Sequence, residues 1–133
     1  MKYLETIITK ELLREVLPKE IENLSEDFSF YIDEDYIVFR DKGETLFDYN
    51  IYKFAFKSKE WALSKGYSQL SGKDNIYEKD EGFVCSIGST TVLIKDFYAD
   101  TEIEATIEAC NWVLGKEIQG DLTEYNKLIK EGL

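Results

Sequence analysis

The sequence predicts an α+β fold, in which an antiparallel sheet of about four or five strands carries helices packed on it. Runs of β-branched and aromatic residues joined by short polar turns indicate antiparallel strands. Segments with apolar residues at helical spacing give the order helix, hairpin, helix, strands, helix, helix. The chain of 133 residues contains one proline and no linker rich in serine or glycine. Residues 1–133 are therefore predicted to form a single domain.

The first predicted helix covers residues 10–17. Thr9 precedes it as an N-cap, because its hydroxyl can accept a hydrogen bond from an unpaired backbone N–H. Pro18 ends it, since proline disfavours helical geometry at the residue before it. A second short turn is expected through Ile21 and Leu24.

A β-hairpin is predicted next, with strands at 28–32 and 36–40. Both strands are rich in aromatic and β-branched residues, and the acidic tripeptide at 33–35 joins them. Residues 41–49 are more polar and contain Gly43, so we expect a loop there.

The segment 50–65 is predicted to be a helix with Asn50 as its N-cap and Gly66 as a left-handed stop. Its apolar arc is wider than a helix packed on one side requires. Two interpretations stay open: the helix contacts a second element as well as the sheet, or it presents aromatic surface to a partner. On the first interpretation, Phe54 and Trp61 are expected to be largely buried.

Three more strands are expected in the second half of the chain. They lie at 67–70, 83–87 and 91–98, where β-favouring residues gather, with a turn at 71–75. Consecutive strands with short connections again favour antiparallel pairing.

A capping box opens the helix that follows these strands. Thr101 and Glu104 have the spacing at which each side chain satisfies a backbone N–H of the other residue. This helix is predicted to run to Leu114 and to stop at Gly115. A last helix is expected over 121–132.

The charge distribution restricts the function more than any motif does. The net charge is −11, and the chain has no histidine. Residues 1–49 and 67–133 each sum to −7, whereas residues 50–66 sum to +3. An acidic surface repels nucleic acid and lipid headgroups and favours basic partners. The lack of histidine removes the commonest general base and metal ligand. We therefore expect no direct nucleic-acid binding and no membrane binding.

No catalytic motif is present, and no metal or cofactor is expected. Cys85 and Cys110 lie in apolar stretches without the spacing of a zinc site. No secretory signal precedes them, which favours two reduced core thiols in a cytoplasmic protein, or in the host cytoplasm if the chain is encoded by a phage. A glycosidase-like enzyme needs only two carboxylates. Enzymatic function is therefore a third hypothesis, and the chain is predicted not to be an enzyme.

Clusters of acidic residues are the candidate partner-binding sites. The residues chosen are Asp33, Glu34, Asp35, Glu78, Asp80 and Glu81. The first three could bind Mg²⁺ or Ca²⁺, but alternating side chains would not converge on one ion, so a solvated hairpin tip is preferred. As a group, the clusters could imitate the phosphates of a nucleic acid and compete for a basic groove. The alternative is a generally acidic surface that only keeps the protein in solution.

The one basic patch consists of lysines in the predicted helix 50–65 and at its end. They are Lys53, Lys57, Lys59 and Lys65. Without arginine or a glycine-rich loop they make a poor phosphate site. They could pair with acidic turns of the same chain, or with acids of a second copy in a homodimer.

Two segments carry a resemblance to known proteins. The run NIYKFAFKSKEWALSKGY at 50–67 and the run DTEIEATIEACNWVL at 100–114 resemble two helices of small phage and prophage proteins. Those proteins pair a "KEWA…GY" helix with a "TEPEAIFKACEWIL" helix, whose proline is replaced here by Ile103. The resemblance implies a phage origin and an α–β–α unit. No activity is assigned to those proteins, so no catalytic residue is implied.

The leading hypothesis is an acidic, non-enzymatic phage-type protein that binds and inhibits a host nucleic-acid-handling defence protein. The expected partner is a basic host protein such as a nuclease effector, and an anti-CRISPR protein is the example we have in mind. The alternative is a structural or regulatory phage protein that self-assembles through the aromatic face of helix 50–65.

Overall fold

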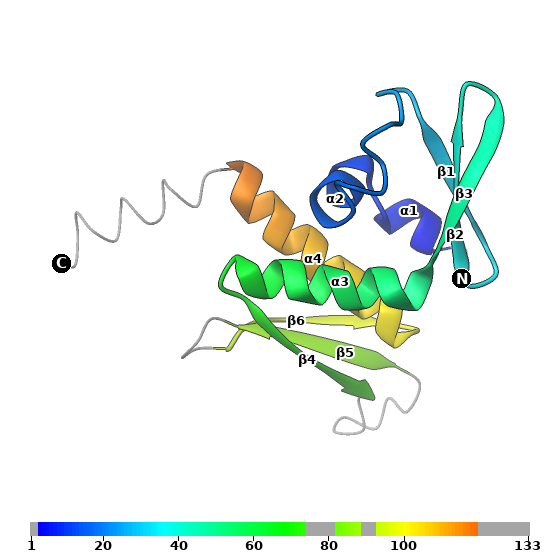
Figure 1. The fold of residues 1–133 in the computed structure, drawn as a ribbon. Helices are drawn as coiled ribbons and strands as arrows, with labels where there is room; N and C mark the ends of the chain where they lie inside the picture. Colours follow the sequence, from blue (N-terminus) through cyan, green and yellow to red (C-terminus); the bar gives the residue numbers. More distant parts are fainter. Residues whose placement is uncertain (1–2, 74–81, 89–92, 120–133) are drawn as a thin grey trace.

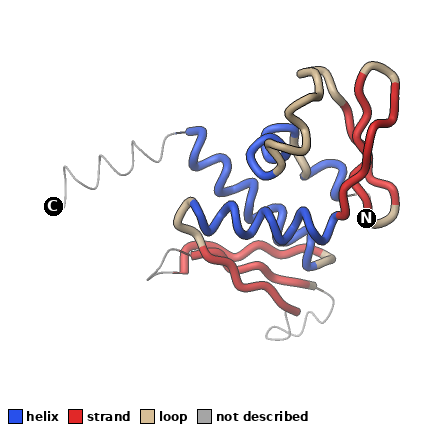
Figure 2. Tube along the Cα trace, in the orientation of Figure 1, coloured by secondary structure: helices blue, strands red, loops and turns tan. Residues whose placement is uncertain are grey.

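The computed structural model describes residues 3–73, 82–88 and 93–119. Within this part the chain forms helices and strands arranged as in Figure 1 and Figure 2. In chain order they are α1 (Leu4–Ile7), α2 (Lys10–Val16), β1 (Ser29–Asp33), β2 (Tyr36–Asp41), β3 (Glu44–Asn50), α3 (Ile51–Ser64), β4 (Ser68–Lys73), β5 (Phe83–Gly88), β6 (Leu93–Ala99) and α4 (Glu102–Gln119). No helix in these residues is both long and apolar enough to cross a lipid bilayer.

The fold is α+β, as predicted, but its strands are divided between two sheets. β1, β2 and β3 form one antiparallel sheet in that order, and β4, β5 and β6 form the other. The described residues therefore contain two three-stranded sheets, not the single sheet of about four or five strands that the sequence predicts. The division arises because α3 begins directly after β3 and carries the chain away from the first sheet before β4 starts (Figure 1).

The first sheet contains the predicted hairpin and one strand that sequence reasoning missed. β1 pairs with β2 in register, with Asp33 opposite Tyr36 at the turn. The predicted loop at 41–49 is wrong, because most of it is β3, paired with β2. Lys42 and Gly43, with φ of 53° and 80°, supply the left-handed backbone of the connecting turn. The prediction failed because β3 is an edge strand whose side chains are mostly exposed, and Glu44, Thr45 and Asp48 among them are polar.

The second sheet matches the predicted strand positions with one extension. The predicted strand at 67–70 corresponds to β4, which continues to Lys73 and so overrides most of the turn expected at 71–75. Residues 74–75 lie outside the described part. The strands predicted at 83–87 and 91–98 correspond to β5 and β6, which pair antiparallel.

The predicted N-caps of α2 and α3 are confirmed. Oγ1 of Thr9 accepts a hydrogen bond of 3.1 Å from the Leu12 amide. Oδ1 of Asn50 accepts two, of 2.9 Å from Tyr52 and 3.1 Å from Lys53. These bonds satisfy N–H groups that have no partner within their helices, so both starts are fixed by local sequence.

The helix ends agree with the prediction at α3 but not at α4. Gly66 follows α3 with φ of 97°, as expected for a left-handed stop. The predicted capping box forms only in part: Oγ1 of Thr101 accepts a hydrogen bond of 3.2 Å from the Glu104 amide, whereas the Glu104 carboxylate accepts one of 2.6 Å from the Thr101 hydroxyl instead of from the Thr101 amide. α4 does not stop at Gly115 but continues to Gln119, because one glycine weakens a helix by only about 1 kcal/mol. The helix predicted at 121–132 lies outside the described residues.

α4 joins the two halves of the molecule. It contacts all three strands of the second sheet on one side, and it contacts α1, α2 and α3 elsewhere along its length (Figure 1). A continuous apolar cluster links both sheets through these helices, with Phe28, Phe39, Phe54, Ile107 and Val113 among its buried members. α1 adds Leu4 to this cluster. Sequence reasoning missed α1 because four residues are too few to show helical periodicity.

Candidate functional site

The acidic turn between β1 and β2 is exposed, as predicted. Asp33 ends β1, Glu34 and Asp35 form the turn, and all three side chains face solvent. Glu34 has φ of 51°, a left-handed conformation. The Ile51 amide donates a hydrogen bond of 2.8 Å to the Asp35 carbonyl, which ties the turn to the start of α3. None of the three carboxylates makes an ion pair within the described residues.

A fourth carboxylate, from α1, lies beside this turn. Oε1 of Glu5 accepts a hydrogen bond of 3.0 Å from the amide of Ile32 at the edge of β1. Glu5 is also exposed, so the acidic tip consists of Glu5, Asp33, Glu34 and Asp35. Sequence reasoning did not place Glu5 here, because it is far from the turn in sequence and no local pattern marks the contact. Glu78, Asp80 and Glu81 lie outside the described residues.

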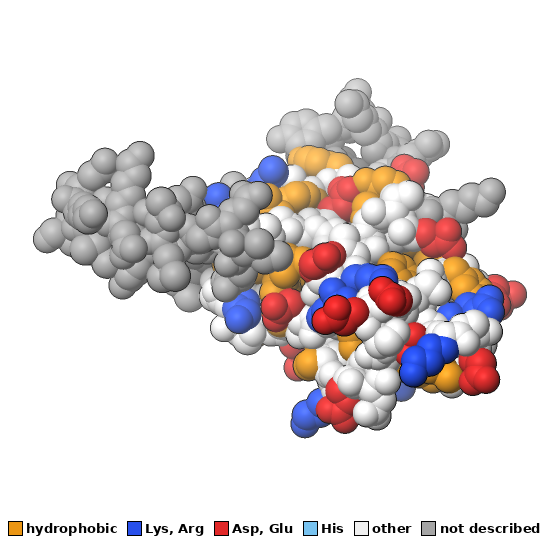
Figure 3. All heavy atoms as spheres, turned by 90° about the horizontal axis from the view of Figure 1, so that it is seen from above, with side chains coloured by type: hydrophobic (Ala, Val, Ile, Leu, Met, Phe, Trp, Pro, Cys, Tyr) orange, Lys and Arg blue, Asp and Glu red, His pale blue; other side chains and the backbone are white. Residues whose placement is uncertain are grey.

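The acidity is not continuous over the face of the molecule that Figure 3 shows. Viewed from above relative to Figure 1, acidic and basic side chains are interspersed with apolar ones (Figure 3). On α2, Lys10 and Arg14 both donate to the Glu26 carbonyl, at 3.2 and 3.4 Å, and their cationic groups lie over the Phe28 ring. This mixture weakens the local negative potential, so the acidic tip is the described feature that best fits a basic partner.

Two of the four lysines in the basic patch pair with acids of their own chain. Lys57 lies 2.8 Å from Glu20 in the turn after α2, and Lys59 lies 4.0 Å from Glu102 at the start of α4. The interpretation of the patch as an intramolecular counter-charge is therefore confirmed for these two residues.

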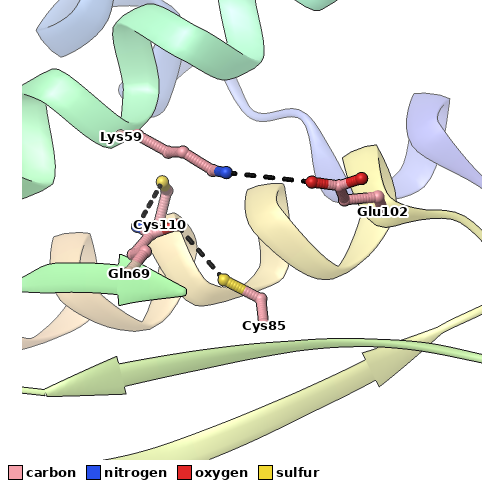
Figure 4. Close-up of polar contacts among 5 residues, drawn as sticks. All are labelled: Lys59, Gln69, Cys85, Glu102 and Cys110. Carbon is pink, nitrogen blue, oxygen red and sulfur yellow. Dashed lines mark hydrogen bonds and ion pairs between the residues drawn. The ribbon is translucent and has the colours of Figure 1, made fainter. Parts of the chain in front are cut away.

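An open groove of about 370 Å³ lies where α3, the start of α4 and the start of β5 meet. It is lined by Tyr52, Ala55, Phe56, Lys59, Phe83, Thr101, Glu102, Ile103 and Thr106. Most of these side chains are apolar, and the paired Lys59 and Glu102 side chains point toward each other at its wall (Figure 4). An apolar groove with a few polar groups can take up an apolar side chain or a short segment of a partner.

Both cysteines lie in the core near this groove and are free. The side-chain amide of Gln69 bridges them: Nε2 is 3.2 Å from Cys110 Sγ, and Oε1 accepts from Cys85 Sγ at 3.3 Å (Figure 4). The predicted pair of unlinked core thiols is therefore confirmed. The bridging role of Gln69 was not predicted, because nothing in the sequence distinguishes it from a surface glutamine.

Their chemistry does not suit nucleophilic catalysis. Burial raises the pKa of the Cys85 thiol to about 11, against the opposing effects of the Lys59 charge and a hydrogen bond with Thr106. Burial likewise raises the pKa of Cys110 to about 12, although its hydrogen bond with Gln69 opposes the shift. Thiols with such pKa values stay protonated at neutral pH, and the thiolate is the reactive form.

The described residues contain no group of three histidine, cysteine, aspartate or glutamate side chains that could hold a metal ion. The search includes the acidic tip, in which Asp33 ends β1 while Glu34 and Asp35 form the turn.

α3 has apolar side chains that are buried and others that are exposed. Phe54 is fully buried, and Trp61 is partly buried against the core. Tyr52, Phe56 and Leu63 are exposed. The helix thus packs on more than one element, as expected, and also presents aromatic surface.

Comparisons with known proteins give no match. No protein-family model matches the chain, and neither any curated protein nor any solved structure does.

Proposed function

We propose that this chain is a non-enzymatic phage-type protein that binds a basic host protein and inhibits it, with a nucleic-acid-handling defence protein as the target. The observation that carries the proposal is the acidic tip. Its four carboxylates, Glu5, Asp33, Glu34 and Asp35, stand exposed at one end of the molecule. They have no cationic partner within the described residues, so their charge is available to a partner.

The tip is also held in place, which favours binding. The Ile51 amide fixes the Asp35 carbonyl, and Glu5 fixes the edge of β1. A preorganised group loses less conformational entropy on binding than a mobile loop does. Carboxylates on such a tip would enter a groove lined with lysine and arginine and occupy the place of phosphates. This is the mode of inhibition that we propose.

Three further observations support the proposal. The first argues against catalysis, the second against nucleic acid as a direct partner, and the third for a phage origin. The buried thiols have raised pKa values, as described above. The net charge of −11 disfavours nucleic acid as a direct partner. The two segments that resemble phage proteins form α3 and α4, which pack against each other. The resemblance thus covers one contiguous part of the fold.

The first experiment identifies the partner with a matched control. The tip variant Asp33→Asn/Glu34→Gln/Asp35→Asn and the control Glu11→Gln/Glu15→Gln/Glu22→Gln remove the same charge from exposed positions. Each protein, with the parent, is used to capture host proteins from a lysate, followed by mass spectrometry. We expect a basic protein that the parent and the control retain and that the tip variant loses.

The second experiment tests inhibition. The association rate of the captured protein is measured against ionic strength, because exposed charges act mainly on this rate and are screened by salt. The captured protein's nuclease or nucleic-acid-binding activity is then measured with the parent, the tip variant and the control. Equal inhibition by the tip variant, or an association rate independent of salt, would contradict the proposal and leave the acidity a role in solubility alone.

A further inference from the structure

α3 carries an exposed apolar ridge that the described chain leaves uncovered. Tyr52, Phe56 and Leu63 are 54%, 64% and 61% exposed. Their spacing of four and seven residues, with Lys59 between the last two, places them on one stripe of the helix. The stripe borders the groove that Tyr52, Phe56 and Lys59 help to line. Large apolar side chains that are exposed next to one another are typical of an interaction surface.

The charge of this surface decides what binds there. Residues 50–66 carry +3, and all other residues together carry the −14 that brings the chain to −11. A basic partner of the kind proposed above would meet lysines here. A second copy would bring the same lysines, but Lys57 and Lys59 are each paired with an acid of their own chain, so the α3 face repels a second copy less than the acidic remainder of the surface does. The ridge and the acidic tip therefore suit different partners.

We propose that a second copy of this chain binds at the ridge, with the two α3 helices antiparallel about a two-fold axis. An isologous contact uses the same surface on both copies. If the axis passes level with the midpoint between Phe56 and Lys59, then Tyr52 faces Leu63 of the second copy. Phe56 then faces Lys59 of the second copy, a cation–π arrangement.

This register also matches charges on the outer flank of the ridge. Lys53 and Glu60 are both exposed and lie on the same side of the stripe. In an antiparallel pair with the same axis, Lys53 of each copy comes next to Glu60 of the other. Two opposite-charge contacts result from a single helix sequence, and a parallel pair would lack them. The groove walls beyond α3, at Phe83 and Ile103, add area that one helix stripe does not supply.

This interaction goes beyond the proposed function, because it uses a different face and needs no host protein. Sedimentation equilibrium of the full chain tests it over a range of protein concentrations. We expect a reversible change from 15.5 kDa to twice that mass, with a Kd of roughly micromolar order. Phe56→Glu should weaken the dimer by about a hundredfold, because it buries two carboxylates at the centre. Leu46→Glu, at an exposed position of β3, is the control and should leave the Kd unchanged.

Charge reversal tests the antiparallel register. Lys53→Glu alone and Glu60→Lys alone each set like charges opposite each other, and each should raise the Kd by about tenfold. The double variant Lys53→Glu/Glu60→Lys should restore the parent Kd. Thermal melts followed by circular dichroism serve to check that every variant is folded. A monomer at all concentrations, a dimer insensitive to Phe56→Glu, or a double variant no tighter than the singles would overturn the proposal.

Discussion

Lys57 joins α3 to the turn after α2 through Glu20: its Nζ donates a hydrogen bond of 2.8 Å to Glu20 Oε1. The hydrogen bond from Lys57 lowers the pKa of Glu20, and burial partly opposes this effect. The pKa of Lys57 is raised, first by the hydrogen bond to Glu20 and then by one with Tyr49. Protonation of Glu20 at low pH should therefore weaken the contact between α3 and the turn after α2.

Glu20→Gln should lower the free energy of unfolding at pH 7 by less than ~1 kcal/mol, because the ion pair is partly exposed. The folded-state pKa of Glu20 lies below its ordinary value of 4.5. Its contribution is therefore complete above pH 4.5 and is lost as the pH falls through the folded pKa. Urea unfolding at pH 7 and pH 3 measures the difference, with Glu22→Gln as the control. A difference that persists unchanged at pH 3 would show that the carboxylate charge is irrelevant.

Phe54→Ala should destabilise the protein by about 3–5 kcal/mol, because it removes a fully buried aromatic ring and leaves a cavity. Phe56→Ala, two residues away on the same helix, provides the control. Phe56 is exposed in the monomer, so its removal should change stability by less than ~0.5 kcal/mol at a protein concentration well below the Kd of the proposed dimer. Thermal or denaturant unfolding of both variants measures the contrast. Similar losses for the two would show that the assigned orientation of α3 is wrong.

Thr101→Ala should cost about 1–2 kcal/mol. The Glu104 amide loses the Oγ1 acceptor at 3.2 Å, and the buried Glu104 carboxylate loses a donor at 2.6 Å. Thr101→Ser keeps the hydroxyl and should retain most of the stability. Denaturant unfolding compares the two, and amide exchange in the first turn of α4 should rise only in the alanine variant. Equal stability of the alanine and serine variants would exclude a stabilising role for the Thr101 hydroxyl.

Neither thiol should react with Ellman's reagent in the folded protein at pH 8, since the pKa values of Cys85 and Cys110 are raised to about 11 and about 12. Both should react at once in denaturant. A thiol whose folded pKa exceeds its unfolded value of 9.0 adds stability that is full below pH 9 and is lost as the pH rises through about 11. Unfolding measured from pH 8 to pH 11 should therefore show declining stability. Rapid labelling of the native protein would reveal an accessible thiolate.

The parts of the fold that were predicted correctly depend on contacts close in sequence. Asn50 and Thr101 cap helices within their own first turns, so the residues that signal the cap also form it. β3 was missed because its register is set by β2 and most of its side chains are exposed, so no apolar alternation marks it. Glu5 and Gln69 were missed because their roles depend on partners brought close only by tertiary folding.

The hydrogen bond from the Ile51 amide to the Asp35 carbonyl makes that amide a built-in spectroscopic reporter. Its proton points at the backbone of the acidic turn, and it belongs to the first residue of α3. In a ¹⁵N-correlated spectrum, the Ile51 cross-peak should shift whenever a ligand grips or distorts the turn, before any change in the rest of the helix. One resonance of the ¹⁵N-labelled protein can therefore follow occupancy of the tip during a titration, without a dye, a tag or a mutation.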